Sequence, residues 1–156
     1  MPNKPDKLGI KFWLACDVNS KYIITGFPYL GKDEKRENSI PLGEFVVLKL
    51  MEPFIECGRN VTPDNFFTSV SLATKLLAKR TTIVGTIREN IYFPKIWELP
   101  KIAKNRKDKM TLFSSKLFIS NQISFTVYKC KPTKNVFVLS SMHKAIEIET
   151  SNKRIP

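Results

Sequence analysis

One stretch in the middle of the chain limits the fold most, because it reads as strand, helix and strand in immediate succession. Residues 59–62 are a short strand candidate. Residues 69–80, SVSLATKLLAKR, then have the composition of a helix, for which Ser69 or Thr68 is available as the N-terminal cap. The β-branched, apolar run TTIVGTI over residues 81–87 predicts a buried strand. This alternation predicts a parallel βαβ unit within an α/β fold.

Two segments ahead of this unit predict a β-hairpin. Residues 10–17 and 22–29 read as strands, with a turn at 18–21 between them. In the first strand, Ile10, Phe12, Leu14 and Cys16 alternate with Lys11, Trp13 and Ala15. A helix is then expected over residues 43–54, because its apolar side chains are three and four positions apart. These side chains are Val47, Leu50, Met51 and Phe54.

Three further strand candidates follow one another closely in the second half of the chain. They cover residues 112–119, 122–130 and 134–141, and the turn KPTKN joins the last two. Such a succession is typical of an antiparallel meander placed after the α/β part. The length of 156 residues fits one domain.

The charge of the chain is strongly positive and unevenly distributed. The net charge is +12, and residues 81–156 carry 14 of the 26 Lys and Arg residues but only 5 of the 14 Asp and Glu residues. A basic run contributes Lys101, Lys104, Arg106, Lys107 and Lys109. A basic half of this kind fits an acidic polymer such as a nucleic acid, but a solvated Lys-rich surface would have the same composition.

Few residues are available for catalytic chemistry. His143 is the only histidine, the three cysteines are widely spaced, and no glycine-rich phosphate loop occurs. Asp64 follows a short strand and precedes a helix, which is where carboxylates gather at the edge of an α/β sheet and can hold Mg²⁺. By itself this position favours a turn or capping role. Asp17 is interpreted as a hairpin-turn residue, and no run of apolar residues is long enough to span a membrane.

Several blocks of the sequence together resemble the piggyBac transposase family and the host proteins derived from it. The blocks are MPNKPDKLGIKFWLACDVNSKY, GFPYLGKDE, RNVTPDNFFTS, TIVGTIREN, LFSSKLFIS and VYKCKPTKNVFVLSS. They cover nearly the whole chain, and RNVTPDNFFTS is highly specific. Residues 91–100, IYFPKIWELP, depart from the family pattern and are interpreted as a small insertion or local divergence.

The resemblance implies an RNase H-like fold in which three aspartates hold two Mg²⁺ ions for phosphoryl transfer on DNA. Only the second aspartate of the family has a counterpart, Asp64. The first strand motif and the motif that opens the last helix have none. The resemblance therefore implies an incomplete α/β core that lacks its first strand and last helix. Residues 1–90 would be the partial core, and residues 91–156 would be the basic segment with an antiparallel β insertion, which is not an independent domain.

Three expectations for function follow from this resemblance. The first is a transposon-derived fragment that does not cut DNA and holds no Mg²⁺ stably, because one carboxylate cannot organise two metal ions. The alternatives are the middle part of an active cut-and-paste transposase, and a non-catalytic module that binds DNA weakly and without sequence preference. A nuclear location is expected from the family. The hairpin and the strand near residues 60–63 would both border the absent first strand, so unpaired sheet edges predict instability or self-association.

Overall fold

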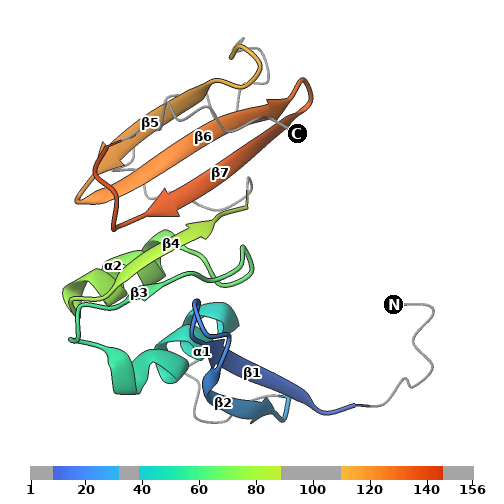
Figure 1. The fold of residues 1–156 in the computed structure, drawn as a ribbon, viewed down its shortest axis with the longest axis vertical. Helices are drawn as coiled ribbons and strands as arrows, with labels where there is room; N and C mark the ends of the chain where they lie inside the picture. The colour runs from blue at the N-terminus through green and yellow to red at the C-terminus, as the bar shows by residue number, and fades with distance from the viewer. Residues whose placement is uncertain (1–8, 32–38, 89–109, 146–156) are drawn as a thin grey trace.

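The computed structural model describes residues 9–31, 39–88 and 110–145, which form a mixed α/β structure (Figure 1). The strands are β1 Lys11–Cys16, β2 Ile23–Tyr29, β3 Asn60–Val61, β4 Thr82–Thr86, β5 Ser115–Ser120, β6 Ile123–Lys131 and β7 Lys134–Ser140. The helices are α1 Leu42–Met51 and α2 Val70–Ala78, with a 3₁₀ turn, η1, at Glu52–Phe54. β1 and β2 form a two-stranded sheet, and the other strands form a five-stranded sheet in the order β3-β4-β7-β6-β5.

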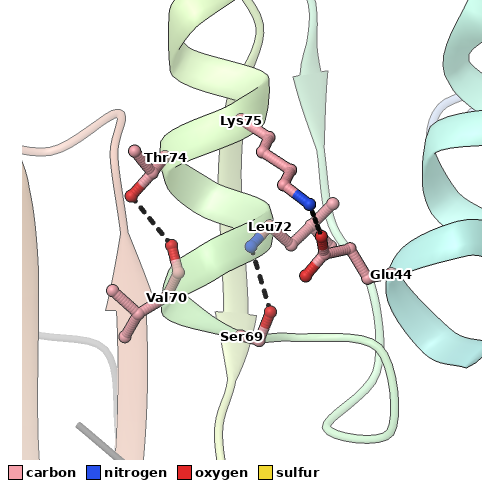
Figure 2. Close-up of polar contacts among 6 residues, drawn as sticks. All are labelled: Glu44, Ser69, Val70, Leu72, Thr74 and Lys75. Atoms are coloured by element: carbon pink, nitrogen blue, oxygen red, sulfur yellow. Dashed lines mark hydrogen bonds and ion pairs between the residues drawn. The ribbon is translucent and has the colours of Figure 1, made fainter. Parts of the chain in front are cut away.

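The predicted βαβ unit is present. β3 pairs with β4 in parallel, with Asn60 opposite Thr82 and Val61 opposite Ile83, and α2 connects the two strands. Ser69 caps α2, because its Oγ accepts a hydrogen bond of 3.0 Å from the backbone N–H of Leu72 (Figure 2). The carboxyl end of β3 therefore leads directly into the loop that carries Asp64.

The predicted meander is also present, and it belongs to the same sheet as the βαβ unit. β5, β6 and β7 pair antiparallel in chain order, and β7 pairs antiparallel with β4. β5 and β6 are joined by Asn121 and Gln122, which both have positive φ, as a two-residue type I′ hairpin turn requires. The meander thus extends the sheet beyond β4 rather than folding as a separate layer, as Figure 1 shows.

The predicted hairpin forms, and the structure decides which of its faces is packed. β1 pairs antiparallel with β2, and the side chain of Trp13 is buried. Phe12 and Leu14, which point to the opposite face of β1, are 53% and 49% exposed. The larger apolar set of the alternation is thus on the outer face of the hairpin in this chain.

The first helix is shorter than predicted. The α-helical part ends at Met51 and continues as η1, because Pro53 has no N–H to extend the hydrogen-bond ladder. The side chains of Val46, Val47 and Leu50 are buried. Phe54, which was expected to continue the apolar face, is only half-buried at the end of η1.

Two apolar clusters hold these elements together. The larger joins α2 to the five-stranded sheet through buried side chains that include Leu72, Leu76, Ile83, Phe125 and Leu139. The smaller joins the hairpin to α1 through Trp13, Val46 and Leu50, and Phe67 packs against both clusters. Within the described ranges, no helix is both long and apolar enough to cross a lipid bilayer.

Candidate functional site

Asp64 lies in the loop between β3 and α2, and its backbone organises that loop. Its carbonyl oxygen accepts hydrogen bonds from the N–H groups of Phe67 (3.0 Å) and Thr68 (3.1 Å), and from Thr68 Oγ1 (3.0 Å). The carboxylate takes no part in these bonds. Its Oδ1 accepts a 2.6 Å hydrogen bond from the N–H of Asn65, and the residue is exposed. The main chain therefore fixes the loop and leaves the carboxylate directed to solvent.

Two glycines allow this loop to pack closely against the elements on either side. A Cβ on Gly85 of β4 would lie 2.5 Å from Thr68 Oγ1 and 2.8 Å from the carbonyl oxygen of Pro63. A Cβ on Gly43 of α1 would lie 2.7 Å from the carbonyl oxygen of Phe66. These separations are too short for any side chain, so the Asp64 loop is held between β4 and α1 by backbone contact.

An aromatic cluster lies immediately after Asp64. The ring of Phe66 stacks on Trp13 of β1, with centroids 6.2 Å apart and planes 8° apart. Phe67 meets both rings edge-to-face, at 5.5 Å from Trp13 and 5.0 Å from Phe66. Trp13 is buried and Phe67 is half-buried, whereas Phe66 is 43% exposed. The cluster therefore couples the hairpin to the Asp64 loop and presents one aromatic side chain at the surface.

Two cations lie over the rings of this cluster. Lys11 Nζ is 4.0 Å from the centroid of the Trp13 ring and 5.2 Å from that of Tyr29. The guanidinium carbon of Arg88, which follows β4, is 5.7 Å from the centroid of the Phe66 ring. All three distances between a cation and a ring centroid suit cation–π interaction. The surroundings of the Asp64 loop are thus basic and aromatic.

The helix that follows the loop is tied to α1 by an ion pair. Lys75 of α2 donates to the Glu44 carboxylate of α1, as Figure 2 shows. Glu44 is buried, whereas the Lys75 side chain is 46% exposed. Because the other oxygen of Glu44, Oε2, is buried without a hydrogen bond, Lys75 supplies the principal polar contact of this carboxylate.

The structure separates the residues that the sequence singled out. Asp64 lies where it was predicted, at the carboxyl end of a parallel strand. Asp17 is a turn residue, as predicted, and its carboxylate accepts hydrogen bonds from the N–H groups of Ser20 (2.7 Å) and Asn19 (3.1 Å). The bond from the Ser20 N–H is the main reason why the pKa of Asp17 is lowered from its ordinary value of 3.8. The basic run Lys101, Lys104, Arg106, Lys107 and Lys109 lies outside the described residues.

Sequence reasoning missed the aromatic and glycine contacts around Asp64. Phe66 and Phe67 stand in the same block as Asp64, but their partner Trp13 is distant in the chain. The available signal was weak: Phe66 and Phe67 closely follow Asp64, and Trp13 lies in the middle of a predicted strand. Gly85 inside a predicted strand is typical of a close approach by another group, but neither Gly85 nor Gly43 reveals which backbone approaches it.

The residues around Asp64 do not by themselves match a two-metal centre. Mg²⁺ is held by several oxygen ligands, and two ions need several converging carboxylates. Among residues 9–31, 39–88 and 110–145, no group of three or more His, Cys, Asp and Glu side chains could hold a metal ion.

Comparison with known proteins identifies the family. The model of the family described as "Transposase IS4" matches residues 1–155, almost the whole chain. The chain belongs to this transposase family. Within it, the chain is of the piggyBac type, as the sequence blocks predicted: it is similar to a piggyBac transposase solved by cryo-EM in a synaptic complex with hairpin DNA.

The similarity to that piggyBac transposase holds for sequence and fold alike. The two chains share 40% sequence identity, and the TM-score is 0.80. The match covers 97% of this chain and 30% of the other. The chain therefore spans about a third of the length of the solved transposase, and the mixed α/β structure described above is similar to that part of a piggyBac transposase.

Proposed function

We propose that this chain is part of the catalytic domain of a piggyBac-type DDE transposase, in which Asp64 is one of the three catalytic aspartates. The observation that carries the proposal is the place of Asp64. It is an exposed carboxylate on a backbone-fixed loop at the carboxyl end of β3, within a chain that matches a piggyBac transposase over 97% of its length. In a complete centre of this family, Asp64 and two further aspartates would hold Mg²⁺, which would supply charge stabilisation for phosphoryl transfer.

The sheet arrangement supports an RNase H-like core that is incomplete. Within the described ranges, β3 pairs only with β4, and β1 pairs only with β2. In an RNase H-like sheet, a central strand would lie between the hairpin and β3 and pair with both. That strand would complete the sheet, and it would bring the first aspartate of the family next to Asp64.

We expect this chain by itself to be catalytically inactive. Asp64 contributes one carboxylate, and no cluster that could hold a metal forms around it within the described ranges. Incubation of the purified chain with supercoiled plasmid and MgCl₂ should leave the plasmid intact. Mg²⁺-dependent nicking that disappears in Asp64→Ala would overturn this expectation, whereas nicking that persists in that variant would reveal a contaminating nuclease.

The alternative is an active cut-and-paste transposase of which this chain is the middle part. The match covers 30% of the solved piggyBac transposase, a share that both a part of an active enzyme and a remnant would have. Sequencing the transcript on both sides of the reading frame separates the two cases. In-frame codons for the first and third aspartate motifs would support an active enzyme, and stop codons or frameshifts would support a transposon-derived remnant.

A third possibility is a non-catalytic module that binds DNA weakly and without sequence preference, and the positive charge is compatible with it as with a transposase. The net charge is +12, Arg88 lies over Phe66 of the Asp64 loop, and Lys11 lies over Trp13, on which Phe66 stacks. Binding of this kind releases counterions, so affinity for duplex DNA should fall steeply as the NaCl concentration rises. The nuclear location expected from the family would be tested with a fluorescent fusion: a signal excluded from the nucleus would contradict it.

A further inference from the structure

The surface next to Asp64 combines a rigid aromatic ring with two cations. Lys11, Trp13, Phe66 and Arg88, together called the Phe66 platform, come from β1, the Asp64 loop and the segment after β4. Phe66 is the exposed member, and Trp13 supports its ring from the hairpin. The platform therefore brings side chains from three distant parts of the sequence to one place.

The backbone of Phe66 is fixed before any ligand arrives. Its carbonyl oxygen packs against Gly43 of α1, and the next residue, Phe67, is anchored among apolar side chains of both clusters. Its ring is constrained further by the stacking on Trp13 and the edge contact with Phe67. An aromatic side chain held in this way loses little conformational entropy when a flat ligand stacks on it.

The chemistry of the Phe66 platform fits an unpaired nucleotide. Bases stack on exposed aromatic rings, and lysine and arginine beside them neutralise the neighbouring phosphates. Inside a duplex both faces of each base are covered by adjacent base pairs, so away from the duplex ends a protein ring can stack only on a base that has left the helix. Arg88 lies over the Phe66 ring and Lys11 lies over the neighbouring Trp13 ring, so the platform carries two cations that attract the phosphates of a strand.

We propose that the Phe66 platform binds an unpaired nucleotide of DNA beside Asp64: the Arg88 guanidinium moves from the Phe66 ring to a flanking phosphate, the base stacks on Phe66 in its place, and Lys11 attracts the phosphate backbone. The inference rests on the proposed function, because it places a strand of DNA next to the exposed carboxylate of Asp64. It adds the form of that DNA, unpaired at this position, and the residue that selects for it.

Fluorescence anisotropy with the 156-residue chain tests the platform. The probes are a labelled oligothymidylate and a labelled duplex of equal length. Phe66→Leu preserves apolar packing on Trp13 but removes the π face. It should weaken oligothymidylate binding about 5- to 150-fold, the loss expected for one base–aromatic stack, and change duplex binding less than about twofold. Phe66→Trp should retain the affinity for oligothymidylate.

The controls use matched residues away from the platform. Phe113, which is 67% exposed and precedes β5, provides Phe113→Leu, which should leave both affinities unchanged. Lys11→Gln should weaken oligothymidylate binding and reduce its dependence on salt. Lys131→Gln, at the exposed end of β6, should have a smaller effect on both the affinity and its salt dependence. The lysine pair keeps the test decisive if Phe66→Leu does not fold, which thermal unfolding of each variant would reveal.

The possible results separate this inference from the proposed function. Loss of oligothymidylate binding in Phe66→Leu with retained duplex binding supports the platform. An equal affinity of the parent chain and Phe66→Leu for oligothymidylate, or equal losses for both probes, overturns it while DNA binding stands. Absence of binding to either probe by the parent chain overturns both the inference and the DNA-binding part of the proposed function.

Discussion

The position of Asp64 depends on two residues that have no side chain. Gly85 and Gly43 let the backbone of the loop approach β4 and α1 to distances that a Cβ would forbid. The loop in turn packs Thr68 and Phe67 into the protein, so the carboxylate is presented from a fixed main chain. At the scale of single residues, the lack of a Cβ on these two glycines therefore contributes to the position of the site as much as its polar groups do.

Gly85→Ala tests this backbone contact. The added methyl group would meet Thr68 Oγ1 and the Pro63 carbonyl, and the backbone oxygen cannot move away without displacing the loop. We expect the free energy of unfolding to fall by about 1–3 kcal/mol, the usual cost of overpacking. Urea unfolding measures the change, with Thr86→Ala, at an exposed position of the same strand, as the control. A Gly85→Ala variant as stable as the parent chain would show that the loop does not pack on β4.

The turn carboxylate of Asp17 should titrate below its ordinary value. Hydrogen bonds from Ser20, the backbone N–H above all, favour the ionised form and lower the pKa of Asp17 from 3.8. A lowered folded-state pKa means that the contribution of this carboxylate to stability is present above pH 3.8. It is lost as the pH falls toward the lower folded value. An NMR titration of the Asp17 side chain checks this, and a midpoint at or above 3.8 would contradict it.

At the scale of elements, the pair Lys75–Glu44 joins the helix after the Asp64 loop to the helix before it. Glu44 is buried and Lys75 reaches it from a half-exposed position. A buried carboxylate needs its partner, because an unpaired charge in the interior is costly. The pair therefore restricts how α1 and α2 can move relative to each other (Figure 2).

A double-mutant cycle measures that link. Lys75→Met removes the cation and leaves the Glu44 carboxylate buried, so we expect the free energy of unfolding to fall by about 1–3 kcal/mol. Combining it with Glu44→Leu removes both charges and should restore stability to within about 1 kcal/mol of the parent chain. Urea unfolding provides the readout, and Lys79→Met, at the exposed C-terminal end of α2, is the control. Additive losses in the double variant would argue against a coupled pair.

At the scale of the whole molecule, the hairpin has one packed face and one exposed face. Trp13 and Ala15 face α1, whereas Ile10, Phe12 and Leu14 remain 76%, 53% and 49% exposed. Contiguous apolar surface of this kind usually marks an interface. Together with the β1 and β3 edges, which pair on one side only within the described ranges, it supports the proposal that the isolated chain self-associates.

Leu14→Lys tests self-association. A charge in the centre of the exposed face should shift the chain toward the monomer in sedimentation equilibrium, because burying an ammonium group against apolar side chains is unfavourable. Val18→Lys, at an exposed position in the hairpin turn outside the strands, should leave the association unchanged. A parent chain that is monomeric and melts cooperatively above about 45 °C, in the range of ordinary mesophilic domains, would refute the proposal.

Local pattern was enough to predict most elements of this protein. The strand–helix–strand order around Asp64 and the antiparallel meander could be predicted because periodicity, β-branching and capping residues act over a few positions. The place of Asp64 followed from the same reasoning, since a residue after a strand and before a helix lies at a sheet edge. The membership of the piggyBac-type transposases came from blocks of residues rather than from periodicity.

Only the tertiary structure decided how these elements meet. Alternation along β1 could not show that Trp13, rather than Phe12 and Leu14, faces α1, because both faces of that strand are largely apolar. The pairing of β4 with β7 and the stacking of Phe66 on Trp13 join residues far apart in the chain, whose contacts depend on packing that local propensity does not encode. The sequence by itself thus determined the elements and the candidate carboxylate, and long-range packing decided the sheet order and the aromatic surface beside Asp64.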